Sequence, residues 1–212
     1  MLSKLIKNTP AIFVVISSLF LLSACQTTDG NLYGYDFQSA RITYQITGSN
    51  TGSSIVFIKG EKKVIKNNIV QTRPDGTKSP VDSYIIQNGD KQYTLDPQTK
   101  TGSLITNPMY AQLKALSPEQ RKAKLIEETV RSNDDLPPVT EKQETVAGQK
   151  CDFFPGTVTK TCLWQAIPLK TITSLPDYGI QVETTATKIE LNQPILDSEF
   201  DVPSDYQITV IK

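Results

Sequence analysis

Three cysteines, Cys25, Cys151 and Cys162, have the most specific chemistry available to this chain. A thiolate can be alkylated, bind a metal, form a disulfide or act as a nucleophile. The 212 residues contain no histidine, which removes the Cys-His and Ser-His nucleophile pairs and every imidazole metal site. The surroundings of each cysteine therefore decide its role.

Residues 1–24 have the pattern of an export signal. Lys4 and Lys7 provide a positive start, and the apolar run AIFVVISSLFLL follows over residues 11–22. Its 12 residues are too few to cross a bilayer, which takes about 20. They fit the apolar region of a signal peptide, roughly 7–15 residues long.

The end of this run, Leu22-Ser23-Ala24-Cys25, resembles the lipobox of bacterial lipoproteins. The resemblance implies diacylglycerol on the Cys25 sulfur, cleavage before Cys25, and an acyl chain such as palmitate on the new amino terminus. Several chains anchor a protein firmly, since each buried CH₂ contributes about 0.8 kcal/mol. In that family an Asp after the cysteine retains the protein in the inner membrane. Gln26 stands here, so the resemblance implies the outer membrane, facing the periplasm.

Cys151 and Cys162 remain as a pair. Export places them in an oxidising compartment, where such a pair usually forms a disulfide. Ten residues separate them, including the turn signal Pro155-Gly156, so we expect a hairpin whose strands are bridged. Closing this short loop contributes roughly 3 kcal/mol in the chain-entropy model. A redox or metal site is the alternative, but redox motifs favour C-x-x-C, and two cysteines without histidine do not complete a usual zinc shell.

Other chemistry finds little support. The 22 basic and 22 acidic residues give no net charge to attract nucleic acid. No G-x-S-x-G, S-x-x-K, G-x-G-x-x-G or Walker lysine loop is present. The carboxylate pairs Glu127-Glu128 and Asp134-Asp135 are typical of a solvated surface. We therefore expect no enzyme, no metal site and no cofactor.

The hydrophobic pattern is mostly that of strands. Ile42, Tyr44 and Ile46 alternate onto one face, and Asn88-Gly89 is a tight hairpin turn. In the longest strand the apolar parity switches between Val182 and Ile189, which predicts a bulge. Strands are expected at 41–47, 54–58, 63–70, 84–87, 92–95, 140–146, 150–154, 160–165, 169–174, 180–191 and 200–210.

One helical segment interrupts the strands. Ser117 and Gln120 have the spacing of a capping box, with Pro118 in the first turn. The helix should end near Ser132 and bury a side formed by Ala123, Ile126 and Val130. A helical turn over residues 108–116 is expected before it.

Many strands around one central helical segment predict an α+β fold with an antiparallel sheet. Asn88 to Pro97 (NGDKQYTLDP) resembles the D-G-K-x-L-W-x-Y-N-P hairpin of the LolA/LolB type of lipoprotein carriers and receptors. Phe200-Asp201-Val202-Pro203 resembles their F-x-x-P-P ending, and residues 162–191 are similar to their large strands. The resemblance, which extends to related uncharacterised envelope domains, implies a half-barrel whose concave face receives acyl chains. It carries over no individual binding residue.

We therefore expect a signal peptide (1–24), an acylated amino terminus and tether (25–38), and one half-barrel domain (39–212). The first functional hypothesis is an envelope lipoprotein that binds lipid, or the acyl group of another lipoprotein, on its concave face. The alternative is a structural or interaction lipoprotein with a closed core that acts through surface contacts. An apolar cavity of roughly 300 Å³ or more favours the first.

Overall fold

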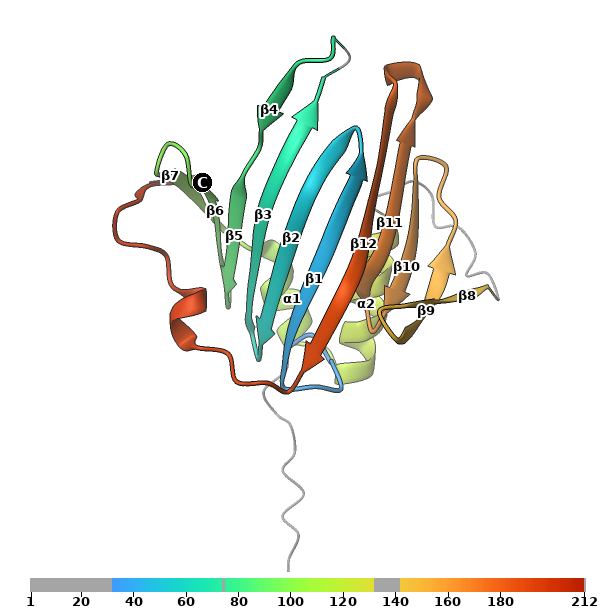
Figure 1. The fold of residues 1–212 in the computed structure, drawn as a ribbon. Coiled ribbons are helices and arrows are strands. Elements are labelled where there is room, and N and C mark those ends of the chain that lie inside the picture. Colours follow the sequence, from blue (N-terminus) through green and yellow to red (C-terminus); the bar gives the residue numbers. More distant parts are fainter. Residues whose placement is uncertain (1–31, 74, 132–141, 212) are drawn as a thin grey trace, which may run out of the picture.

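The computed structural model describes residues 32–73, 75–131 and 142–211, and within them one curved sheet of 13 strands dominates the molecule (Figure 1). The predicted signal segment 1–24 and Cys25 lie outside the described residues. The strands are β1 (Ser39–Gly48), β2 (Asn50–Lys59), β3 (Lys62–Thr72), β4 (Lys78–Pro80), β5 (Ser83–Asn88), β6 (Lys91–Asp96), β7 (Thr101–Thr106), β8 (Gln143–Val146), β9 (Gln149–Phe154), β10 (Thr159–Trp164), β11 (Ile167–Leu175), β12 (Ile180–Leu191) and β13 (Gln207–Val210).

The sheet order is β13-β7-β6-β5-β3-β2-β1-β12-β11-β10-β9-β8, with β4 on the far part of β3. Neighbours are antiparallel except β13 and β7, which run parallel. Figure 1 shows the sheet curving around the helices α1 (Pro108–Lys114) and α2 (Pro118–Arg131). The predicted fold class, an α+β half-barrel around a short helical segment, is therefore confirmed.

The bulge predicted in the longest strand is present. Ile42 of β1 faces Ile189 of β12, whereas Tyr44 faces Ala186, so the pairing slips by one residue between Thr43 and Tyr44. The slip keeps apolar side chains of both halves of β12 on the concave face, because side chains alternate along a strand.

The helix α2 begins as predicted, but one of the three residues predicted to be buried is exposed. The Ser117 hydroxyl accepts from the Gln120 amide (3.3 Å), and the Gln120 side chain accepts from the Ser117 amide (3.0 Å), which is the predicted capping box. Ile126 and Val130 pack against Phe154 and Leu163. Ala123 is exposed, contrary to the prediction, because the contacts on this side of the helix reach only its later turns.

Residues 32–37 are not the tether that was predicted for 25–38. Leu32, Tyr33 and Phe37 are buried, and the rings of Tyr33, Tyr35, Phe37 and Trp164 stack in series with centroids 5.5, 4.9 and 5.7 Å apart. The tether prediction is wrong here because Leu32 and Tyr33 pack with Leu113 of α1, and Phe37 belongs to the core cluster of the concave face. Trp164 is partly buried and packs against the core cluster of the concave face.

The carboxyl-terminal segment also differs from the prediction of one strand over 200–210. It forms a short 3₁₀ helix, η2 (Asp197–Phe200), and then only the strand β13, because Pro203 cannot donate to a ladder. Phe200 inserts among Val64, Ile86 and Leu95 on the convex face. This segment, red in Figure 1, therefore covers a second core on the outside of the sheet.

Candidate binding groove

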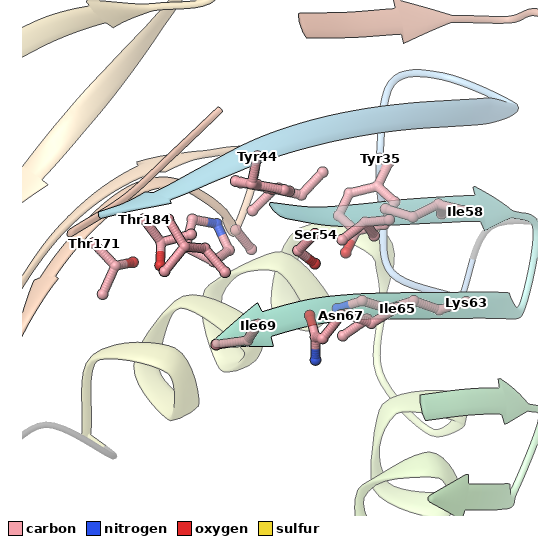
Figure 2. Close-up of a pocket in the computed structure, with 15 residues that line it drawn as sticks. Tyr35, Tyr44, Ser54, Ile58, Lys63, Ile65, Asn67, Ile69, Thr171 and Thr184 are labelled. Carbon is pink, nitrogen blue, oxygen red and sulfur yellow. The ribbon is translucent and has the colours of Figure 1, made fainter. Parts of the chain in front are cut away.

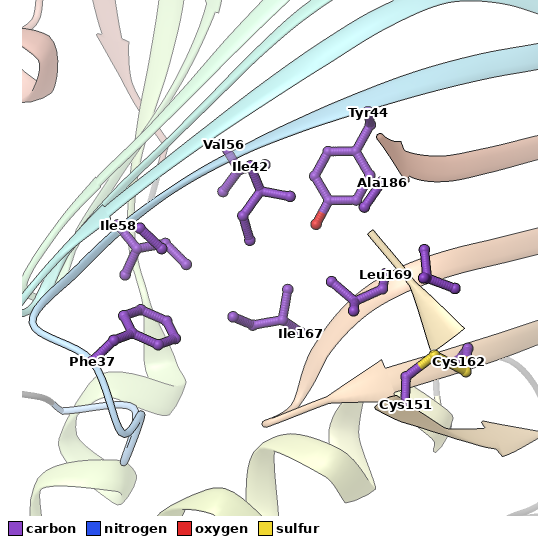
Figure 3. Close-up of a cluster of buried hydrophobic side chains, with 12 residues drawn as sticks. Phe37, Ile42, Tyr44, Val56, Ile58, Cys151, Cys162, Ile167, Leu169 and Ala186 are labelled. Atoms are coloured by element: carbon purple, nitrogen blue, oxygen red, sulfur yellow. A yellow bond between two sulfur atoms is a disulfide. The ribbon is translucent and has the colours of Figure 1, made fainter. Parts of the chain in front are cut away.

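A groove of about 280 Å³ lies on the concave face, beside the part of that face that is filled by core side chains. The filled part, shown in Figure 3, centres on Ile42, Ile58, Ile167 and Leu169. The groove is lined by side chains from five strands, the amino-terminal segment and the β10–β11 turn: Tyr35, Tyr44, Ile46, Ser54, Val56, Ile58, Lys63, Ile65, Asn67, Ile69, Ala166, Ile167, Pro168, Thr171 and Thr184.

Strand alternation creates the floor of the groove. Every second residue of β3, namely Lys63, Ile65, Asn67 and Ile69, faces it, and Figure 2 shows them following one another along the strand. At about 3.3 Å per residue these four positions span roughly 20 Å. One acyl chain covers about 15 Å, since two leaflets make a hydrocarbon layer of about 30 Å. The floor is therefore long enough for a single chain.

Polar groups interrupt this apolar surface in its middle and at one end. Ser54, Asn67, Thr171 and Thr184 line the groove, and the Asn67 amide donates to the Ser83 hydroxyl over 3.1 Å. Figure 2 places Tyr35, Ile58 and Lys63 at one end and Thr171 and Thr184 at the other. The groove is thus amphipathic, with Lys63 at one end, Thr171 and Thr184 at the other, and Ser54 and Asn67 between them among apolar side chains.

Lys63 is the charged residue of the groove. Among the described residues that line it, no other carries a charge, and the structure gives the Lys63 ammonium no ion pair or hydrogen bond within the described part of the chain. Its side chain is half-buried, and desolvation by the surrounding protein lowers its pKa. The next lysines of β3 point the other way: Lys62 lies 3.6 Å from Asp197, and Lys66 lies 2.6 Å from Glu199.

Two phenols of the groove are held neutral. Burial raises the pKa of Tyr35 and of Tyr44 above that of a free tyrosine. The largest cause in each case is the loss of hydration of the phenolate. At neutral pH the described lining of the groove therefore offers a ligand one charge, the positive charge of Lys63.

The predicted cysteine pair lies in the core next to the groove. Cys151 of β9 and Cys162 of β10 are joined by a disulfide, with Cα atoms 5.3 Å apart. Both are buried within the same cluster as Ile42 and Leu169, as Figure 3 shows. The disulfide connects the two strands of one hairpin, as the spacing of the cysteines predicted.

Of the two carboxylate pairs, the structure describes Glu127 and Glu128. Glu127 and Glu128 both pair with Lys124, at 3.4 and 2.6 Å, on the partly exposed side of α2. Asp134 and Asp135 lie outside the described residues. The described ranges contain no group of His, Cys, Asp and Glu that could hold a metal ion.

Sequence reasoning named no ligand-binding residue and so missed Lys63. The available signal was its parity: Lys63 shares a face with Ile65 and Ile69, so a lysine had to lie among apolar side chains. Ile42, Tyr44 and Ile46 were predicted to share one face of a strand. All three are buried, and Tyr44 and Ile46 also border the groove.

Together the fold and the groove define an open half-barrel with a partly filled concave face. No family model and no curated protein matches the chain. An uncharacterised conserved protein from Thermus thermophilus has a similar fold, with a TM-score of 0.50 and 9% identity over 82% of this chain and 91% of that one. That likeness concerns the fold alone.

Two further solved structures are more distant. The Pseudomonas aeruginosa MucA/MucB complex matches with a TM-score of 0.39 and 14% identity, over 82% of this chain and 58% of that chain. PNGF-II matches with a TM-score of 0.42 and 10% identity, over 82% of this chain and 32% of that chain. Neither likeness is close enough to support an argument about function. Within the described ranges, no helix is long and apolar enough to cross a membrane.

Proposed function

We propose that this protein is a membrane-anchored envelope lipoprotein that binds one acyl chain in its concave groove. The observation that carries the proposal is the unfilled groove of about 280 Å³, bordered by Ile46, Val56, Ile65 and Ile69. This volume lies just below the roughly 300 Å³ at which small-molecule pockets begin. It suits one extended chain rather than the several chains of a complete lipoprotein amino terminus.

The anchor rests on the sequence of the amino terminus. The resemblance of residues 22–25 to a lipobox supports acylation of Cys25 and attachment to the outer membrane, facing the periplasm. The described structure begins at Leu32, so the acylated end would be joined to the half-barrel by only a few residues. The groove would then lie close to the membrane from which a lipid could enter.

The alternative, a closed structural or interaction protein, has one observation in its favour. The part of the concave face around Ile42, Ile167 and Leu169 is filled by side chains, so the open volume is small. We favour binding because the open part is continuous along β3 and mostly apolar. The proposal assigns binding, not catalysis, to this surface.

A groove-filling substitution tests the proposal. In the chain from Gln26 onward, which retains every described residue, Ser54→Phe should place a ring in the groove and abolish binding of a fluorescent acyl probe. The matched control is Ser53→Phe, which should leave binding of the probe unchanged. Ser53 directly precedes Ser54 in β2 and is exposed on the opposite face of the sheet. Thr184→Phe, on the opposite wall, repeats the test if Ser54→Phe does not fold. A probe that binds all folded variants equally would overturn the proposal.

A further inference from the structure

We propose that Lys63 makes the groove specific for a single-chain amphiphile with an anionic head, a carboxylate or a phosphate. This inference rests on the proposed acyl-binding function and names the ligand class of that site. It is carried by the position of Lys63 on the groove floor and by the absence of a carboxylate from the described lining.

The comparison with the other lysines of β3 supports a functional position. Lys62 and Lys66 lie on the convex side, where Asp197 and Glu199 from the carboxyl-terminal segment neutralise them. Lys63 faces inward, and the part of the chain that the structure describes supplies no such partner for it. A half-buried ammonium without a counter-ion is costly, whereas a bound anion would restore the charge balance.

The surroundings of Lys63 also set the orientation of the ligand. Lys63 lies opposite Ile58 in the β2–β3 pair, at the end of the groove where Figure 2 places Tyr35. Ile65 and Ile69 continue along the same strand toward Thr184. An anionic head therefore belongs near Lys63, and its tail extends over Ile65 and Ile69.

The size of the groove limits the tail to one chain. The roughly 20 Å between Lys63 and Ile69 accommodates the about 15 Å of one acyl chain together with its head, and the volume of about 280 Å³ is at the lower limit for small-molecule pockets. The charge limits the head to an anion, because a second cation would be repelled and a neutral head would leave the ammonium unpaired.

The test compares three probes with the same ten-carbon alkyl tail and different heads: undecanoate, decyl phosphate and decanol. Titration calorimetry on the chain from Gln26 should show both anions binding about tenfold or more tightly than decanol, since a hydrogen bond to a charged group is typically worth that ratio. Lys63→Met should remove this preference and leave decanol binding intact, whereas Lys63→Arg should keep it. Lys63→Gln serves if the Met variant does not fold.

Lys62→Met is the matched control, because it removes the adjacent lysine from the opposite face and should leave the preference unchanged. If all three probes bind equally to the native protein and to Lys63→Met, the role of Lys63 is wrong while the acyl groove stands. If none of the probes binds, the proposed function itself fails. If inorganic phosphate binds as tightly as decyl phosphate, the site recognises a head alone and the amphiphile assignment is overturned.

Discussion

Replacement of Phe200 by alanine should be one of the most damaging single changes outside the concave core. Phe200 is 2% exposed and fills the convex face among Val64, Ile86 and Leu95. Truncation of a buried phenylalanine to alanine costs about 3–5 kcal/mol, because transfer energy is lost and a cavity remains. For a chain of this size each kcal/mol lowers the midpoint by about 2–4 °C, so Phe200→Ala should lower it by roughly 6–20 °C.

The same segment contains its own control. Leu196 precedes Phe200 by one helical turn and is 72% exposed, so Leu196→Ala should change the free energy of unfolding by no more than about 0.5 kcal/mol. Urea and thermal unfolding, followed by circular dichroism, measure both variants. If Phe200→Ala lowered the free energy of unfolding no more than Leu196→Ala does, packing of the carboxyl-terminal segment on the convex face would not stabilise the protein. Our account of the second core would then be wrong.

Three further predictions concern the disulfide, the tyrosines and the anchor. Reduction of the Cys151–Cys162 disulfide, whose sequence separation is 11, should lower the free energy of unfolding by roughly 3 kcal/mol. Free thiols at both positions in the exported, oxidised protein would contradict the disulfide. Burial raises the pKa of Tyr35 and Tyr44 above the ordinary 10.0, so at higher pH the folded state keeps protons that the unfolded state releases. The free energy of unfolding should therefore not change with the ionisation of these tyrosines below about pH 10, and should fall above it by about 1.4 kcal/mol per pH unit per tyrosine. The chain has eight tyrosines and Tyr178 is exposed, so the signal of Tyr35 and Tyr44 is taken as the difference in phenolate absorbance between the native protein and the Tyr35→Phe/Tyr44→Phe variant. This difference should rise only as the protein unfolds, and a rise in the folded state would refute the prediction. Cys25→Ser should abolish fatty-acid labelling and processing of the precursor, and normal labelling of the variant would disprove the lipobox assignment.

Local signals in the sequence predicted the local structure well. The parity switch between Val182 and Ile189 located the bulge, because a strand with one buried face must insert a residue to change parity. Ser117 and Gln120 located the start of α2, because capping depends on backbone groups only three residues apart.

Predictions failed where the partner is distant in sequence. β7 was missed, and β13 pairs with it in parallel although about 100 residues separate them. Residues 32–37 were taken for a tether because their burial depends on Trp164 and the helices, which a short window does not contain.

The groove lay beyond sequence reasoning for a similar reason. Alternation showed which residues of β1 share a face, but not whether the elements opposite would fill the space. Ile42 lies in the core cluster with Ile167 and Leu169, whereas Ile46 borders the open groove. The difference depends on how β11 and β3, which are distant in sequence, are placed in the assembled sheet.

The amount of lipid that copurifies with the chain from Gln26 onward tests the central claim most directly. Mass spectrometry of protein purified without detergent, after several extraction conditions, should find about one single-chain anionic lipid per protein molecule, and less of it in Ser54→Phe. Protein that is folded and free of lipid under every condition would contradict an acyl-binding groove and leave the closed interaction protein as the better account.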